Sequence, residues 1–137
     1  MEHPYGEKVR MKARYHVALS VALSLPFLSI GEHWMALTCL LSGIFIDVDH
    51  LVDYYVSHGK FTLSITELSN EMDTDMYICP LHSWEFLTLL FLFSLRFNFL
   101  VGAVWGVLTH IIADMITNPI HFRNVFLVVR MRKKWKT

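Results

Sequence analysis

The chain has 137 residues, a formal net charge of zero, 54% hydrophobic residues and only 18% charged residues. This length suits one domain with a single buried core, and the composition is more apolar than that of an ordinary soluble domain. The two cysteines exclude a disulfide framework, and the balanced charge gives no direct evidence for a nucleic-acid partner. Basic residues gather at both ends of the chain: Lys8, Arg10, Lys12 and Arg14 near the start, and Arg130, Arg132, Lys133, Lys134 and Lys136 near the end.

The first two apolar runs predict a tight helical hairpin. Residues 17–30 are apolar and include Pro26, which a membrane helix tolerates more readily than a soluble helix does. The residues after this run, from Gly31 onward, contain no small-x-small cleavage site, so we expect a retained helix rather than a signal peptide. A second run covers 34–46 after a turn of a few residues, and helices joined so closely are antiparallel neighbours.

The second run ends in a cluster of ionisable side chains: Asp47, Asp49, His50 and Asp53. On a helix, Asp47 and His50 share one face, whereas Asp49 and Asp53 share roughly the opposite face. Burying such groups is costly unless they are paired or bind a cation. Two interpretations stay open for this stretch alone, a metal site or polar residues in a loop after a buried helix.

A polar connection covers residues 54–81, with a short amphipathic helix expected near 61–70. Pro80 marks the end of this connection, and a third apolar run covers 84–95 and extends through Phe97. This is the one sizeable polar connection of the chain, and we expect an acidic loop to follow its short helix.

The fourth apolar run covers residues 99–116 and is stopped by Asn118-Pro119. The tail 120–135 alternates bulky apolar with basic residues, as expected of an amphipathic segment on an anionic membrane surface. We find no internal repeat.

The apolar runs are somewhat shorter than the ~20 residues that span ~30 Å of hydrocarbon, which argues against a membrane. They also lack the polar stripe that each helix of a small soluble bundle carries. We therefore predict an all-α fold, a single four-helix up-down membrane-embedded bundle over residues 1–137 with a polar cytoplasmic connection and an amphipathic C-terminal segment. Basic flanks place both termini on the cytoplasmic side of the inner membrane, in a multi-pass topology. The alternative is a soluble helical bundle that acts as a binding module.

This topology brings side chains from all four runs to the inner end of the bundle. That end holds His16, the 47–53 cluster, His82, Glu85, His110 and Asp114, whereas the opposite end holds Glu32, His33, Arg96 and Asn98. A lone histidine near a helix end is more often hydrogen-bonded to a carbonyl group than a ligand, and His82 with Glu85 also suits a helix cap. His110 and Asp114 are harder to explain in this way, because ionisable groups inside a membrane helix usually mark function.

A nitrogen and oxygen ligand set suits zinc first, with manganese or another first-row divalent ion second. The predicted metal ligands are His16, Asp47, Asp49, His50, His82, His110 and Asp114. Asp49 or Glu85 is the predicted catalytic base, with Asp53 as an alternative. Cys79 adds only weak support for thiolate ligation. The set is large enough for two ions, an arrangement that suits phosphodiester cleavage.

The same residues resemble the motifs of the YdjM-like family, small inner-membrane-associated proteins described as LexA-binding, metal-dependent hydrolases. That family shows an early His, an Asp-x-Asp-His at the end of an apolar helix, a Thr-His-Ser before the next helix and a late His-x-x-x-Asp. The matching residues are His16, Asp47-Val48-Asp49-His50, His82-Ser83, and His110 with Asp114. Two positions depart from the pattern, because Tyr77 stands where the family often has His and Ile46 stands where it usually has Pro.

The run from His110 to His121 also resembles, with one additional residue, the His-x-x-x-Asp-x-x-x-Pro-x-His pattern of zinc phospholipase C and fungal single-strand nucleases. Together the resemblances imply an integral membrane hydrolase that cleaves an ester or phosphoester at the cytoplasmic face. The substrate is either a lipid or a soluble molecule. Membrane lipid is then the expected partner, and the sequence does not indicate an oligomeric state. The alternative is a non-enzymatic membrane protein whose cluster binds a structural metal or carries ions or protons.

Overall fold

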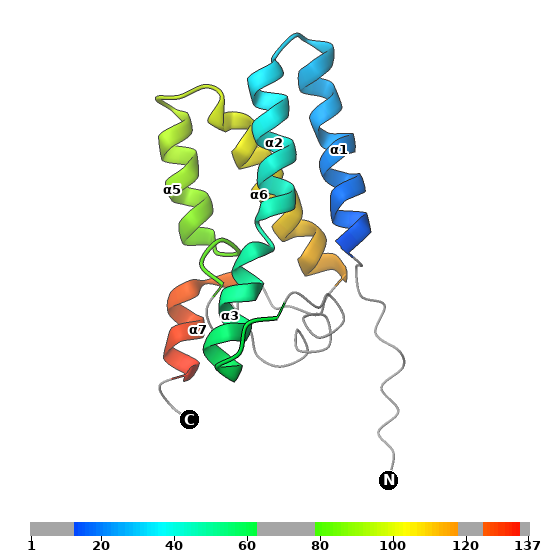
Figure 1. Cartoon of the computed structure of the whole chain (residues 1–137). Coiled ribbons are helices and arrows are strands. Elements are labelled where there is room, and N and C mark those ends of the chain that lie inside the picture. Colours follow the sequence, from blue (N-terminus) through cyan, green and yellow to red (C-terminus); the bar gives the residue numbers. More distant parts are fainter. Residues whose placement is uncertain (1–12, 63–78, 118–124, 135–137) are drawn as a thin grey trace.

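The computed structural model describes residues 13–62, 79–117 and 125–134 (Figure 1). Within these ranges the regular elements are helices: α1 (Ala13–Ser29), α2 (His33–Phe45), α3 (Val48–His58), α5 (Trp84–Ser94), α6 (Leu100–Thr117) and α7 (Leu127–Lys134). The predicted all-α class is confirmed. Most of the helix expected near 61–70, the stop at Asn118-Pro119, Tyr77 and His121 fall outside the described residues.

Two helical hairpins make up the upper part of the molecule in Figure 1, α1 with α2 and α5 with α6. The first turn needs Gly31, whose φ of 83° lies in the left-handed region that side chains rarely adopt. The most extensive helix contacts join α2 to α6, α1 to α2 and α5 to α6. The sequence-predicted hairpin of the first two apolar runs is therefore present.

Glycines on α6 bring its backbone against that of α2. A Cβ atom added at Gly102 would lie 1.9 Å from the carbonyl oxygen of Met35, and one at Gly106 would lie 2.5 Å from that of Cys39. The Ser42 hydroxyl donates a hydrogen bond of 3.2 Å to a carbonyl group of α6. Small residues four positions apart and cross-helix hydroxyl bonds are the packing devices of membrane helices. This contact holds the N-terminal half of α6 against α2, and His110 lies one turn beyond Gly106.

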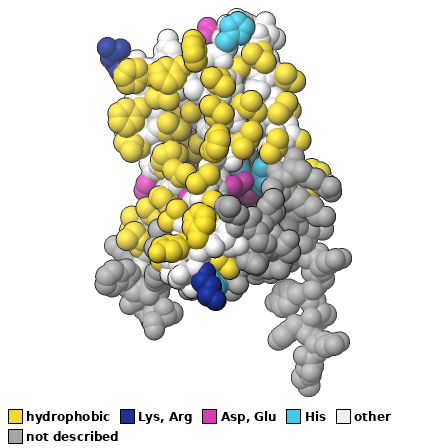
Figure 2. All heavy atoms as spheres, viewed as in Figure 1, with side chains coloured by type: hydrophobic (Ala, Val, Ile, Leu, Met, Phe, Trp, Pro, Cys, Tyr) yellow, Lys and Arg dark blue, Asp and Glu magenta, His cyan; other side chains and the backbone are white. Residues whose placement is uncertain are grey.

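Many polar side chains lie inside the molecule and many large apolar side chains lie outside, although a small apolar cluster of Ile46, Val107, Ile111 and Val125 is also buried. The buried polar residues are His16, Ser20, Ser24, Asp49, His50, His82, Ser83, Ser94, His110, Asp114 and Arg130. Leu25, Leu92 and Leu95, by contrast, are each more than half exposed. Figure 2 shows hydrophobic side chains covering the helical hairpins on this face, with few charged groups among them. This distribution is the reverse of that in a soluble bundle.

Two helices are long and apolar enough to cross a membrane, His33–Val56, which runs through α2 and α3, and Leu100–Thr117. The apolar helices at Tyr15–Ser29 and Trp84–Ser94 are shorter. A core helix of a soluble protein passes the same test of length and composition, so this finding alone gives weak support for a membrane.

Helix α3 was not predicted as a separate helix by the sequence analysis. We placed the start of the polar connection at residue 54, whereas α3 continues to His58 and ends at Gly59, which has a φ of 64°. Only Ile46 and Asp47 interrupt the path from α2 into α3. A left-handed glycine at this position is a common way to end a helix. The polar residues 54–58 therefore extend the helix instead of beginning a loop.

Candidate metal centre

Four side chains point their donor atoms at one another where α2, α5 and α6 meet. The two imidazole Nε2 atoms of His82 and His110 lie 3.3 Å apart. Asp47 Oδ1 lies 3.5 Å from the first of these atoms and 3.2 Å from the second. Asp114 Oδ2 lies 3.6 Å and 3.4 Å from the same two atoms. The topology predicted this convergence of groups that are far apart in the sequence.

The other nitrogen of each central imidazole is engaged by an oxygen atom. His82 Nδ1 lies 2.9 Å from Asp49 Oδ1, and His110 Nδ1 lies 3.0 Å from the carbonyl oxygen of Gly43. A carboxylate and a carbonyl group only accept hydrogen bonds, so Nδ1 carries the proton in both rings. Each ring is thereby oriented with Nε2 toward the cluster, which is how imidazole ligands are usually held.

Asp49 is fully occupied by this positioning role. Its side chain is 3% exposed, and its Oδ2 atom accepts hydrogen bonds from the backbone amides of Leu81 (2.9 Å) and His82 (3.3 Å). Since Oδ1 accepts from the His82 ring, both oxygens have protein partners. The contacts of Asp49 therefore orient His82, and Asp49 also belongs to a group with His50 and His82 that could hold a metal ion, as the sequence analysis predicted.

His16 extends the cluster on the side of α1. Its Nε2 atom lies 3.5 Å from Asp114 Oδ1, and its ring stacks on that of His110 with centroids 4.2 Å apart. The two oxygens of Asp114 therefore face different imidazoles. The buried Nδ1 atom of His16 has no hydrogen-bond partner among the described residues.

His50 extends the cluster on the opposite side, toward the loop before α5. Its Nε2 atom lies 3.7 Å from Asp47 Oδ1, and its Nδ1 atom lies 3.6 Å from the sulfur of Cys79. Burial first, and then the nearby charge of Asp49, raise the pKa of the Cys79 thiol. This residue is therefore held as a neutral thiol, in agreement with the oxygen and nitrogen ligand set inferred from the sequence.

The spacing of the central donor atoms fits a small divalent ion. Donors about 2.0–2.1 Å from a tetrahedral zinc ion lie about 3.3–3.4 Å from one another. The Nε2 atoms of His82 and His110 lie 3.3 Å apart, and Asp47 Oδ1 and Asp114 Oδ2 each lie 3.2 to 3.6 Å from both of these nitrogen atoms. Ligand atoms lie within 4.8 Å of one another in three groups: His16, His110 and Asp114; Asp47, His82 and His110; Asp49, His50 and His82. The described residues can thus hold a metal ion.

The side chains of the cluster differ in their exposure to solvent. The side chain of Asp47 is 33% exposed, whereas that of Asp114 is 13% exposed and that of His110 is 2% exposed. Burial lowers the pKa of His82, but hydrogen bonds to Asp47 and Asp49 raise it more, so the net pKa lies above 6.5. A proton and a metal ion therefore compete for Nε2 of this ring. Asp47 is thus the most solvent-exposed carboxylate of the cluster.

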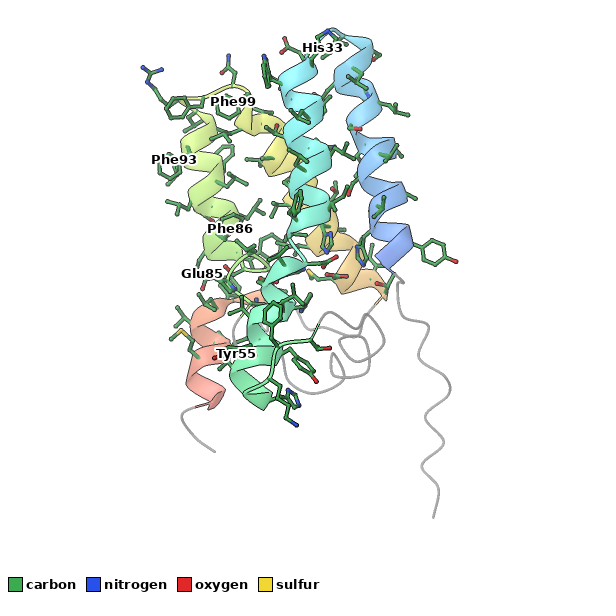
Figure 3. The ribbon with its side chains drawn as sticks, viewed as in Figure 1. His33, Tyr55, Glu85, Phe86, Phe93 and Phe99 are labelled. Atoms are coloured by element: carbon green, nitrogen blue, oxygen red, sulfur yellow. The ribbon has the colours of Figure 1, made fainter. Side chains whose placement is uncertain are left out.

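Glu85 is not among these ligand groups, although the sequence analysis named it as a candidate base. Its two oxygens accept hydrogen bonds from the backbone amides of Leu127 (3.0 Å) and Val128 (3.3 Å) at the start of α7. Figure 3 shows Glu85 at the end of α5 that faces α7, and His33 at the far end of the bundle. A carboxylate at the positive end of a helix stabilises that helix. The contacts of Glu85 thus join α7 to α5.

Two contacts around the cluster were not foreseen from the sequence. One is the carbonyl group of Gly43 that orients His110. The other is Arg130, whose Nη2 atom donates to the backbone oxygens of His82 and Val125. Both involve backbone atoms, which leave no residue-type signature, and we had counted Arg130 only among the basic residues of the tail.

No family model matches the chain, and no curated protein or solved structure matches it. The resemblance to the YdjM-like family therefore stays a prediction from the residues that carry it. The case for the metal centre depends on the geometry of the cluster itself.

Proposed function

We propose that this protein is a membrane-embedded, metal-dependent hydrolase that cleaves an ester or phosphoester at the cytoplasmic face of the inner membrane. The observation that carries the proposal is that the Nε2 atoms of His82 and His110 lie 3.3 Å apart, with an oxygen of Asp47 and an oxygen of Asp114 each 3.2 to 3.6 Å from both. Two imidazoles and two carboxylates suit zinc, with manganese as the second choice. Buried carboxylates and imidazoles that are not needed for packing favour a functional site.

A bound ion of this kind would polarise the substrate oxygen and lower the pKa of a water molecule. Asp49 and the Gly43 carbonyl group keep the rings of His82 and His110 oriented. Asp47 is the most exposed carboxylate of the cluster, so it is placed to accept the proton of the attacking water. Water adds to the phosphorus or carbonyl carbon, the bond to the leaving oxygen breaks, and that oxygen takes up the proton.

The distribution of side chains supports the membrane part of the proposal. The exposed surface of the helices is apolar, and the polar groups face inward. At 18 residues, α6 is about 27 Å long, close to the thickness of the hydrocarbon layer. We infer a four-helix up-down bundle of α1, α2, α5 and α6 with both termini in the cytoplasm. Carbonate extraction of expressed membranes tests this directly: the protein should remain in the pellet, and its release into the supernatant would contradict the proposal.

Hydrolysis is tested with the purified protein and a panel of chromogenic carboxylic esters, phosphomonoesters and phosphodiesters. Chelation should abolish activity, and zinc or manganese should restore it. Asp47→Asn should lower activity about 100-fold or more, whereas His33→Ala at the far end should leave it unchanged. Activity that survives both chelation and the Asp47 substitution would contradict the proposal.

A structural metal site is the second candidate, and the number of donors favours it. Four protein donors complete a tetrahedral shell, whereas a catalytic ion keeps one position open. Cobalt substitution separates the two candidates, because azide changes the visible spectrum of Co²⁺ only when a position is exchangeable. An unchanged spectrum would favour the structural site, and a shifted spectrum would favour hydrolysis.

A further inference from the structure

Arg130 is a buried cation whose hydrogen-bonding capacity is only partly used. Its relative exposure is 5%. A guanidinium has five N–H donors, and those of Nη2 serve the carbonyl oxygens of His82 and Val125. The Nε and Nη1 atoms are buried and have no hydrogen-bond partner in the part of the chain that the structure describes. Three N–H groups on two edges of the guanidinium therefore remain available.

The charge of Arg130 interacts with that of Glu85, but three N–H donors of the buried guanidinium have no partner among the described residues, which is costly and makes a group rich in acceptor oxygens the natural complement. Glu85 is the acidic residue on the neighbouring helix, but its oxygens are held by the backbone amides of Leu127 and Val128. Holding the His82 carbonyl group in place requires only the Nη2 donors. A purely structural role for Arg130, in which it only holds the His82 carbonyl group, does not account for the buried and unpartnered Nε and Nη1 atoms.

The position of Arg130 links it to the metal centre. It binds the backbone oxygen of His82, whose ring supplies a central donor atom. From the other side, Asp49 accepts hydrogen bonds from the amide and the ring of the same residue. An anion bound to Arg130 would therefore lie beside the residue that presents Nε2 to the metal.

We propose that Arg130 binds a phosphoryl group of the substrate, so that the hydrolase acts on phosphoesters rather than on carboxylic esters. This inference rests on the proposed function. A phosphoryl group is anionic and carries several acceptor oxygens, which match the charge and the free donors of the guanidinium. A carboxylic ester is neutral and offers fewer acceptor oxygens, so it matches the three free donors less well.

The phosphoryl group could come from a lipid headgroup or from a soluble phosphoester. The side chains near Arg130 bear on the choice between these two sources. Apolar side chains near this end are exposed, with Val128 at 52%, Met131 at 47% and Ile116 at 79%. The test therefore includes both sources, phosphatidic acid in mixed micelles and soluble glycerol phosphate, each competing with inorganic phosphate.

Binding of inorganic phosphate to the full-length protein in detergent is measured by calorimetry, with and without zinc. We expect Arg130→Gln to weaken phosphate binding at least about tenfold in both conditions, as the loss of charge-assisted hydrogen bonds predicts. Arg96→Gln, which removes an exposed guanidinium at the opposite end, should leave the affinity unchanged. Displacement of phosphate by phosphatidic acid identifies a lipid source, and displacement by glycerol phosphate identifies a soluble one.

Unchanged phosphate affinity in a folded, zinc-binding Arg130→Gln protein would overturn this inference and leave the hydrolase proposal intact. If the wild-type protein binds phosphate through Arg130 but neither binds zinc nor hydrolyses the test substrates, the hydrolase proposal is overturned and phosphate binding by Arg130 stands. A measurement on the wild-type protein avoids dependence on the folding of a variant. The ¹⁵N-arginine Nε signal of Arg130, assigned with Arg130→Lys, should shift on addition of phosphate, and a fixed signal would overturn the inference.

Discussion

The two ends of the helical bundle carry similar residue types in opposite surroundings. At the far end, Glu32, His33 and Arg96 are exposed, and the Arg96 guanidinium rests over the Phe97 ring at 5.6 Å. At the other end, the imidazoles of His82 and His110 and the carboxylate of Asp114 are buried, and both imidazoles lie within 4 Å of Asp114 and of the partly buried Asp47. Exposed ionisable groups need no protein partner, whereas buried ones require partners or a cation. The difference between the ends therefore lies in burial rather than in residue type.

The largest expected effect comes from separating the helices that form the buried end. Gly106→Leu would drive a side chain into the α2 backbone and move His110, one turn further along α6, away from Asp47. We expect a loss of about 3 kcal/mol or more in stability, together with loss of bound metal. Thermal unfolding in detergent and metal analysis measure both. Val101→Leu, on the exposed side of the same helix, serves as the control, and equal behaviour of the two variants would contradict the packing account.

Removing the orienting carboxylate should have the next largest effect. Asp49→Asn keeps the size of the side chain but weakens its hold on His82 Nδ1, and such changes lower metal affinity about 10- to 100-fold. Zinc titration against a competing chelator measures this, with Glu32→Gln at the exposed end as the matched control. An unchanged zinc affinity in Asp49→Asn would mean that the His82 ring is held by other contacts.

The pH dependence of metal binding should reflect the raised pKa of His82. A raised pKa means that a proton occupies Nε2 up to a higher pH, so zinc affinity is complete above that pKa and is lost as pH falls through it. Where one proton must be displaced, the zinc Kd should rise about tenfold for each unit of pH lost. His33→Ala should give the same profile, whereas a flat profile for the wild type would exclude His82 as a ligand.

The smallest expected effect concerns Glu85. Because its oxygens accept from the first amides of α7, Glu85→Gln should cost about 0.5–1 kcal/mol of stability and leave hydrolysis within about twofold of the wild type. Chemical denaturation and a steady-state assay measure the two quantities. A large loss of hydrolysis with unchanged stability would return Glu85 to the catalytic role that the sequence suggested.

Apolar runs and turn residues were enough to predict α1, α2, α5 and α6 and the hairpin at Gly31. The meeting of His16, His82 and His110 followed from topology, since alternating helix directions bring these positions to one end. The sequence could not assign roles within the cluster. Asp47 and Asp49 belong to the same motif and are separated by a single residue. Asp47 lies beside the Nε2 atoms of His82 and His110, whereas Asp49 contacts Nδ1 on the other edge of the His82 ring.

The contacts that escaped prediction involve the backbone or depend on a helix orientation that no pattern specifies. Gly43 contributes only its carbonyl oxygen, and Arg130 binds the carbonyl group of His82, which is far from it in the sequence. The extent of α3 was missed because its polar residues resemble a loop, although Gly59 ends it in the usual way. Interactions between backbone atoms and distant side chains emerge only when the helices are placed in space.

The most direct test of the central claim is metal analysis of the purified protein beside His110→Ala and His33→Ala. The account predicts stoichiometric zinc or manganese in the wild type and in His33→Ala, and its loss in a folded His110→Ala protein. Equal metal content in all three proteins, or none in any of them, would contradict the claim that the buried end of the bundle is a metal centre.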